Sequence, residues 1–285
     1  SATALLQVIC EEEECHRYLL DKHRPAMLAA LVLRMGAVRS AGGKPEQTVC
    51  NATLALLEAM PEVNDAPATE GAAALGDDGE ASIIGEDTPL PPAALVSVLR
   101  TAKLDALLHA RSLARITLTP AAMRREPPEP YALFERLHPY VGVQSAPVRE
   151  TVLAAISELC VAARVDATFT QQAVHLLLRA LVDDAPPVRI QALVGLRHLG
   201  SSGALKQHLT SELFETALST LAATLAEPNV DVGLAAFAAL VPALAAANTA
   251  SVATLLAQLS EHSRAAVEND EGGARLRAAG FETFA

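Results

Sequence analysis

The sequence is poor in the residues that several common protein classes require. It has no Trp, and only 3% of its 285 residues are aromatic. No apolar run reaches the roughly 20 residues of a membrane-spanning helix, because the Ala-rich stretch 234–247 is short and contains Pro242. The cysteines are too few and too scattered for a disulfide framework, which favours a reducing, cytoplasmic location. They are Cys10, Cys15, Cys50 and Cys160.

Basic residues are also scarce. The chain has 22 Lys and Arg against 33 Asp and Glu, which gives a formal net charge of -11. A negative surface repels phosphate backbones, and the only adjacent basic pair, Arg124 and Arg125, lies beside a proline-rich turn. We therefore expect no nucleic-acid partner and no membrane span.

No arrangement of residues typical of a catalytic or metal site is present. Cys10, Cys15 and His16 lie around four Glu, but a zinc site normally uses closely paired ligands in two clusters. We interpret this segment as a solvated acidic helix face. The chain has no His-Glu-x-x-His motif and no Gly-x-Ser-x-Gly elbow. We therefore predict no catalytic, cofactor-binding or metal-binding residues and no small-molecule substrate, which makes the protein a non-enzyme.

Hydrophobic residues make up 51% of the chain, mostly as Ala and Leu. These are the strongest helix formers, so the composition predicts an all-α protein. A helical pattern recurs from four anchors that lie 40, 42 and 44 residues apart, each followed by apolar residues at helical spacing. The anchors are Val148, Val188, Val230 and Ala274.

Each anchored helix follows another amphipathic segment, which makes pairs of helices. The preceding segments are 131–141, 168–183, 205–226 and 251–268. A helix pair of about 40 residues cannot bury its apolar side alone and must stack on a neighbour. We therefore predict an α-solenoid of stacked antiparallel helix pairs, a superhelix of the HEAT or armadillo type. The predicted core anchors are Val148, Val188, Leu193 and Val230.

The chain divides into three predicted parts. Residues 1–60 hold amino-terminal helical repeats, including a pair at 25–39 and 45–60. Residues 61–92 are rich in Ala, Gly, Pro, Asp and Glu without helical period, which predicts a poorly ordered acidic loop. Residues 93–285 hold the regular repeats, which we expect to continue beyond residue 285.

The order "DDAPPVRIQALVGL" resembles a HEAT repeat, with an Asp, a Pro in the turn, and Val-Arg opening the second helix. In that family the Asp and Arg contact each other across neighbouring repeats as a ladder. The resemblance assigns these roles to Arg149, Asp184, Arg189, Asp270 and Arg275. Gln144 and Ala226 do not match the Asp, and Asp231 stands at the Arg position, which puts continuity of the ladder in doubt. The alternative is ordinary helix-end acids and solvated arginines.

The carboxy-terminal half, from "PPVRIQALVGLRHLGSSG" to "HSRAAVENDEGGARLRAAGFETFA", is similar to the carboxy-terminal region of the Maestro heat-like repeat family. Members of that family are large, non-enzymatic helical solenoids. The resemblance implies a scaffold that binds other proteins in a large complex, in a cytoskeletal or ciliary (axonemal) assembly. It supplies no catalytic residues.

Two other functions stay open at the sequence level. One is a transport or trafficking adaptor, of the importin or vesicle-coat type, that binds basic peptides; the net charge permits this. The other is a regulatory subunit of an enzyme. Binding of basic peptides would weaken steeply with ionic strength, whereas a permanent apolar interface would not.

Overall fold

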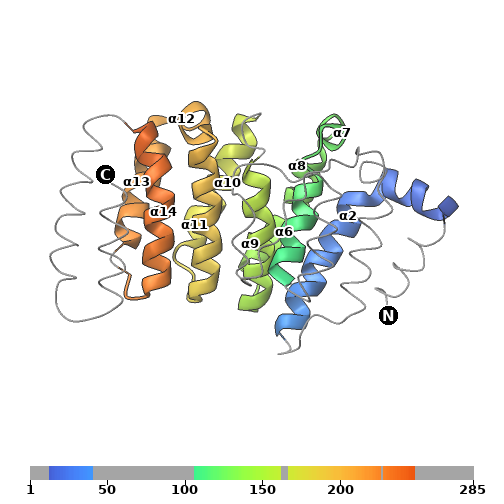
Figure 1. Ribbon diagram of the computed structural model, residues 1–285, viewed down its shortest axis with the longest axis horizontal. Helices are drawn as coiled ribbons and strands as arrows, with labels where there is room; N and C mark the ends of the chain where they lie inside the picture. The colour runs from blue at the N-terminus through green and yellow to red at the C-terminus, as the bar shows by residue number, and fades with distance from the viewer. Residues whose placement is uncertain (1–12, 41–105, 162–165, 226, 248–285) are drawn as a thin grey trace, which may run out of the picture. The chain divides into compact units, whose positions relative to one another are not determined.

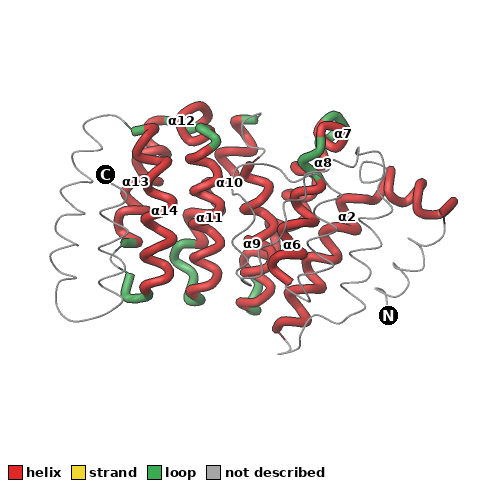
Figure 2. The backbone as a smooth tube through the Cα atoms, viewed as in Figure 1, coloured by secondary structure: helices red, strands yellow, loops and turns green. Residues whose placement is uncertain are grey.

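The computed structural model describes residues 13–40, 106–161, 166–225 and 227–247. Within these ranges every regular element is a helix and no strand occurs, as Figure 2 shows. The predicted all-α class is confirmed for this part of the chain. The helices predicted at 45–60 and after residue 250 lie outside the described residues.

The chain forms two compact units, Ser1–Arg136 and Leu137–Ala285, which we call the amino-terminal and carboxy-terminal units. Their boundary falls near the end of a helix, at a position that the sequence pattern did not indicate. The boundaries predicted at 60 and 92 lie outside the described residues. The two units are described separately below.

The amino-terminal unit contains a long helix, α2 (Glu13–Ser40), which packs against α6 (Ala106–Ile116). Two shorter helices follow, α7 (Pro120–Met123) and α8 (Glu129–Leu137). The sequence predicted a helix at 25–39 and, separately, an acidic helix face at 10–17. In the structure α2 continues through Pro25 and begins twelve residues earlier.

A buried ion cluster joins three helices of this unit. Arg24 of α2 donates to the carbonyl oxygen of Ile116 at 3.4 Å and lies 3.1 Å from Glu129 Oε2. The other carboxylate oxygen of Glu129 lies 3.1 Å from Arg125 Nε. Arg24 and Glu129 are both almost fully buried. Removing one partner from a buried pair leaves an uncompensated charge, so this cluster restricts how the three helices pack.

The carboxy-terminal unit contains a row of three helices, α9 (Ala146–Leu159), α11 (Pro186–Ser201) and α14 (Val230–Ala246). Helix α11 contacts α9 on one side and α14 on the other, and the three lie side by side in Figure 1. Helix α10 (Ala167–Ala180) packs on α11, and α13 (Ser211–Thr224) packs on α14. The short elements η1 (His138–Gly142) and α12 (Ala204–His208) complete the unit.

The helices begin in two chemically different ways. Helices α10 and α13 start at polar side chains, since Asp166 and Thr210 accept hydrogen bonds from backbone N–H groups of their own first turns. Helices α9 and α11 carry Pro147 and Pro186 in their first two positions and have no side-chain cap. Proline has no N–H to satisfy and its φ already suits a helix, so it starts these helices without a capping side chain.

In the three helices of the row, we compare burial at equivalent positions, counted from the residue that precedes each helix. That residue is Ser145 for α9, Ala185 for α11 and Asn229 for α14. Three positions later stand Val148, Val188 and Val232; Val188 and Val232 are fully buried, whereas Val148 is half-buried. Val230, the anchor predicted for α14, is also only half-buried. Asn229 caps α14 and shifts its register by two residues, so Val232 takes the buried position.

Two glycines allow α11 to approach its neighbours closely. A Cβ on Gly195 would lie 2.9 Å from the methyl groups of Leu177 in α10 and 3.1 Å from Ser157 Oγ in α9. A Cβ on Gly200 would lie 3.1 Å from the ring of Pro242 in α14. Across the same α9–α11 contact, Ser157 donates to the carbonyl oxygen of Gln191 at 2.6 Å. Small residues at the crossings therefore bring backbones together and help fix the row.

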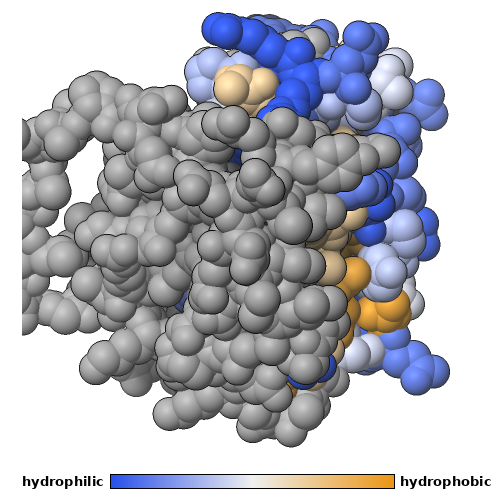
Figure 3. All heavy atoms as spheres, turned by 90° about the vertical axis from the view of Figure 1, so that its right-hand side faces the viewer, coloured by the Kyte–Doolittle hydropathy of each residue, from blue (hydrophilic) through white to orange (hydrophobic). Residues whose placement is uncertain are grey.

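The outer surface follows the amphipathic pattern of the helices. In the side view of Figure 3, the described surface that can be seen is mainly hydrophilic, with hydrophobic residues gathered mostly in its lower part, beside the grey atoms. Among the described residues of the carboxy-terminal unit, the large hydrophobic residues with the most exposure are Tyr140, Val161, Val182 and Val241. None of the helices built from described residues is both long and apolar enough to cross a membrane.

Candidate functional site

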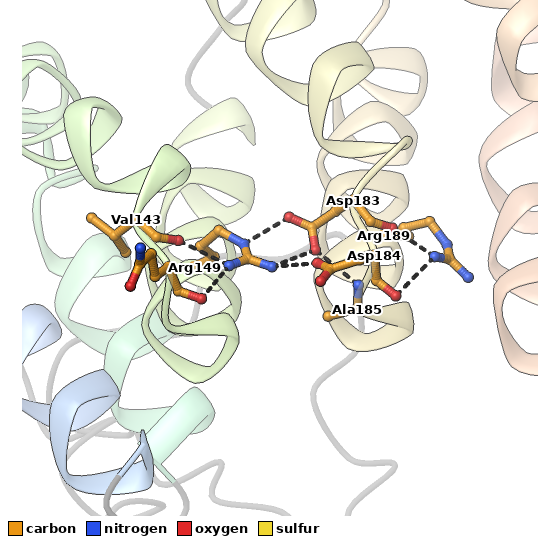
Figure 4. Close-up of polar contacts among 7 residues, drawn as sticks. Val143, Arg149, Asp183, Asp184, Ala185 and Arg189 are labelled. Atoms are coloured by element: carbon orange, nitrogen blue, oxygen red, sulfur yellow. Dashed lines mark hydrogen bonds and ion pairs between the residues drawn. The ribbon is translucent and has the colours of Figure 1, made fainter.

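The most strongly bonded polar site lies at the edge of the row where α9 and α11 begin. Arg149, in the first turn of α9, uses all five of its N–H groups. Its Nη1 donates to the carbonyl oxygens of Val143 and Gln144, each at 2.8 Å, in the turn before its own helix. Its Nε and Nη2 donate to Asp183 Oδ2 and Oδ1, each at 2.7 Å, in the turn before α11. Figure 4 shows how the guanidinium bridges the two turns.

Two adjacent acids, Asp183 and Asp184, bind Arg149 in different ways. Asp183 binds it through both carboxylate oxygens, and its side chain is only 13% exposed. Its Oδ1 also accepts from the backbone N–H of Ala185 at 2.9 Å, which stabilises the turn that starts α11. Asp184 makes one contact, from Arg149 Nη2 at 2.7 Å, and its side chain is 91% exposed. Asp183 is therefore the principal partner.

A similar junction joins α11 to α14. Arg189 donates through Nη1 to the carbonyl oxygens of Asp183 at 2.6 Å and Asp184 at 3.5 Å. These carbonyls lie six and five residues before Arg189, the same spacing by which Val143 and Gln144 precede Arg149. Arg189 Nη2 lies 3.3 Å from Glu227 Oε2, in the turn before α14. Each arginine thus binds its own turn and reaches an acid in the turn before the next helix of the row.

The second junction is looser than the first. Asp183 lies two residues before Ala185, which precedes α11, and Glu227 lies two residues before Asn229, which precedes α14. The two acids therefore occupy equivalent positions. Glu227 is one methylene longer and meets Arg189 at a single long contact, and Arg189 Nε is buried without a hydrogen-bond partner among the described residues. A bidentate pair at 2.7 Å is stronger than one contact at 3.3 Å.

The structure brings together three of the five predicted ladder residues, Arg149, Asp184 and Arg189. Asp270 and Arg275 lie outside the described residues. Asp183 and Glu227 were missed, because the sequence was aligned on the Val anchors rather than on the residue that starts each helix. Arg149 and Arg189 lie four residues after the residue that precedes their helices, and the equivalent residue of α14 is Gly233. The assignment of Asp231 to the arginine position was therefore wrong. Glycine cannot supply a guanidinium, so α14 has no arginine at the equivalent position.

The ion pair changes the acidity of both groups. Burial favours the neutral form of Asp183, but hydrogen bonds from Arg149 and from the N–H of Ala185 hold the pKa of its carboxyl below the usual value. The hydrogen bonds that Arg149 donates to Asp183 raise the pKa of Arg149 despite its burial. The carboxylate form of Asp183 therefore contributes to the stability of the folded state.

Stability should depend on pH through Asp183. Its folded-state pKa is lowered, so its contribution is complete above the unfolded value of about 3.9 and is lost as the pH falls through the folded value. We expect the difference in unfolding free energy between the wild-type chain and Asp183→Asn to be largest near neutral pH and to shrink below about pH 4. Urea denaturation at a series of pH values measures this.

The exposed acid Asp231 offers the control for the pH series, because no ion pair joins it to another described residue. Asp231→Asn should change the unfolding free energy by a small amount that varies little with pH. A difference for Asp183→Asn that is equally independent of pH would contradict the ion pair.

The looser junction, between Arg189 and Glu227, predicts a smaller loss of stability on mutation. Arg189→Ala should lower the unfolding free energy by about 1–2 kcal/mol, because it removes the hydrogen bonds to the Asp183 and Asp184 carbonyls and one long ion pair. The effect should be smaller than that of Arg149→Ala, measured by urea denaturation under the same conditions. An equal or larger effect would show that the geometry of the two junctions does not rank their strengths.

One free cysteine lies in this unit. Cys160, at the end of α9, is fully buried. Burial, together with the negative charge of Glu158, raises the pKa of its thiol. A thiol held in its neutral form is a poor nucleophile, so Cys160 is a core residue rather than a reactive one. Within the described ranges, no group of three or more His, Cys, Asp or Glu is placed to hold a metal ion.

Comparisons with known proteins add little. No protein-family model matches the chain, and no curated protein matches it. The crystal structure of an engineered protein from a structural genomics consortium is similar with a TM-score of 0.46 and 16% identity, over 90% of this chain and 97% of that one. A TM-score below 0.5 does not establish a shared fold, so this likeness supports no function.

Proposed function

We propose that the protein is a non-enzymatic helical scaffold that binds other proteins, built as an α-solenoid of stacked antiparallel helix pairs. The observation that carries the proposal is the recurring junction at the edge of the row. Arg149 reaches the acids before α11, and Arg189 reaches the acid before α14. Such a recurrence is expected where equivalent units stack on one another, and stacked units make extended surfaces suited to binding.

The proposal places the chain among HEAT-like proteins, with a resemblance in sequence to the Maestro heat-like family. A role in a cytoskeletal or ciliary assembly, in the cytoplasm or axoneme, rests on that resemblance alone, as an analogy. The packing of α10 on α11 and of α13 on α14 supports the pairing of helices. The chemistry of the described site also agrees with a structural role, since the carboxylates of Asp183 and Glu227 are bound by arginines of the same chain.

The alternative is a transport or trafficking adaptor that binds basic peptides reversibly. The net charge of -11 permits it, because acidic surfaces attract basic segments. The two functions differ in how binding depends on salt. An adaptor that recognises charge should lose affinity steeply as ionic strength rises, whereas a permanent apolar interface should not.

Affinity purification of the full chain from cells, at low and at high salt and with quantitative mass spectrometry, tests both functions. A scaffold should retain the same stoichiometric protein partners at both salt concentrations. Partners lost at high salt would favour the adaptor. Absence of any stoichiometric protein partner would contradict both.

A further inference from the structure

Helices α11 and α14 share a surface strip that the core does not use. Counted from the residue before each helix, positions 2, 5, 9, 12 and 16 lie on one face of an α-helix. In both helices every residue at these positions is half-buried or exposed. The opposite side of α11 carries Val188, Ala192 and Leu196, which are fully buried. We call these ten residues the α11–α14 strip: Pro187, Ile190, Val194, Arg197, Ser201, Asp231, Leu234, Ala238, Val241 and Ala245.

The strip is apolar at most of its positions, although each helix leaves it accessible. Only Arg197, Ser201 and Asp231 are polar. Its most exposed large hydrophobic residue, Val241, is 43% exposed. Helices α11 and α14 are in contact and lie side by side (Figure 1). Positions 5 and 9 of both helices are apolar, and because these positions are equivalent we expect the two faces to adjoin as one surface. A contiguous apolar surface on paired helices is typical of a binding site.

The strip ends within the row. The residues of α9 at the same positions 5, 9 and 12 are Glu150, Ala154 and Ser157, and all three are buried. The accessible apolar surface therefore belongs to the α11–α14 pair and does not continue across the equivalent part of α9. Its long direction follows the helices, from Asp231 to Ala245, which corresponds to about 21 Å at 1.5 Å per residue.

The charges at the start of the strip indicate what could cover it. Asp184, Glu227 and Asp231 lie where α11 and α14 begin. Arg149 binds Asp184 and Arg189 binds Glu227, but no ion pair joins Asp231 to another described residue. Asp231 lies on the strip itself, three residues before Leu234. A partner with an apolar face and a basic end would complement both the surface and this carboxylate.

We propose that the α11–α14 strip binds an amphipathic helix of a partner protein, with the partner's apolar face on the strip and a Lys or Arg near Asp231. The inference rests on the proposed protein-binding function and identifies the surface and the chemistry of the partner. A helix of about 15 residues, or four turns, matches the length of the strip. Its apolar side chains would cover Ile190, Val194, Leu234 and Val241.

The test uses the full chain and a fluorescein-labelled peptide of about 15 residues, with Leu at helical spacing and its Lys and Arg gathered at one end. A scrambled peptide of the same composition is the control for composition. Fluorescence anisotropy should give a Kd below about 100 µM for the amphipathic peptide and at least about tenfold weaker binding for the scrambled one. No saturable binding, or equal binding of both peptides, would overturn the proposal.

Two exposed valines of the carboxy-terminal unit provide matched variants. Val241→Lys places a charge on the strip, and Val182→Lys adds the same charge at a residue that is 83% exposed and outside the strip. Val241→Lys should weaken binding at least about tenfold, and Val182→Lys less than about twofold. Circular dichroism and thermal unfolding verify that both variants fold. Equal effects of the two variants would place the peptide elsewhere and overturn the proposal.

The contribution of the Asp231 carboxylate to peptide binding is tested separately. Asp231→Asn should weaken binding about threefold and reduce its dependence on salt between about 50 and about 300 mM NaCl. An unchanged affinity and salt dependence would contradict the assigned position of the basic end.

Affinity purification with Val241→Lys distinguishes this proposal from the broader one. If the variant retains all partners of the wild-type chain, the strip is not the binding surface although the scaffold function stands. If the wild-type chain itself captures no partner, the scaffold function fails.

Discussion

Arg149→Ala should lower the unfolding free energy of the carboxy-terminal unit by about 3 kcal/mol, the largest effect expected of a polar substitution among the described residues of that unit. The side chain of Arg149 is 9% exposed and makes five hydrogen bonds. Its removal leaves the Asp183 carboxylate without its cation, and it leaves the Val143 and Gln144 carbonyls without this donor. Urea denaturation of the full chain, followed by circular dichroism, measures the loss.

Two variants make this result specific. Arg149→Lys keeps the charge but cannot reproduce the bidentate contact with Asp183, so it should be intermediate. Arg179→Ala removes an exposed arginine from the last turn of α10 and should change the unfolding free energy by less than about 0.5 kcal/mol. If Arg149→Ala were no more destabilising than Arg179→Ala, the contacts of Arg149 would contribute no net stability.

Leu193→Ala should lower the unfolding free energy by about 2–5 kcal/mol. Leu193 lies in the middle of α11 and is fully buried. Truncation removes apolar area from the core and leaves a cavity that neighbouring helices fill only in part. The same denaturation experiment measures this effect, and the midpoint should fall without a large change in slope.

Leu234→Ala is the matched control, since it deletes the same atoms from a half-buried leucine of the α11–α14 strip. Its effect should be below about 1 kcal/mol, because the side chain is partly in water already and no closed cavity forms. Similar losses at the two leucines would mean that the strip is packed rather than accessible, which would also weaken the inferred binding surface.

Much of the local structure of the carboxy-terminal unit could be predicted from sequence. The segments anchored at Val148 and Val188 are helices with a proline in their first two positions, and α10 overlaps the predicted segment 168–183. These features depend on residues within about one turn of one another, such as a proline that suits the first turn or apolar residues at helical spacing. The register of α14 was missed, because alignment on Val230 overlooked Asn229, whose side chain caps the helix.

The partners in the site could be predicted only in part. The sequence resemblance assigned Arg149, Arg189 and Asp184 to a ladder. In the structure the more buried partner of Arg149 is Asp183, and the acid that Arg189 contacts is Glu227. These acids lie 34 and 38 residues from their arginines. Whether an acid meets a guanidinium at such a separation depends on helix lengths and crossing geometry, which periodicity alone does not specify.

The sequence by itself determined that this chain forms helices, where several of them start, and which residues of α11 face inward, because those properties arise from neighbours along the chain. Only the tertiary structure decided that Asp183 pairs with Arg149 and Glu227 with Arg189. The same is true of the buried pair of Arg24 and Glu129 and of the accessible apolar strip on α11 and α14. Each of these depends on segments distant in the sequence being brought within a few ångströms by packing, and no local pattern encodes that distance.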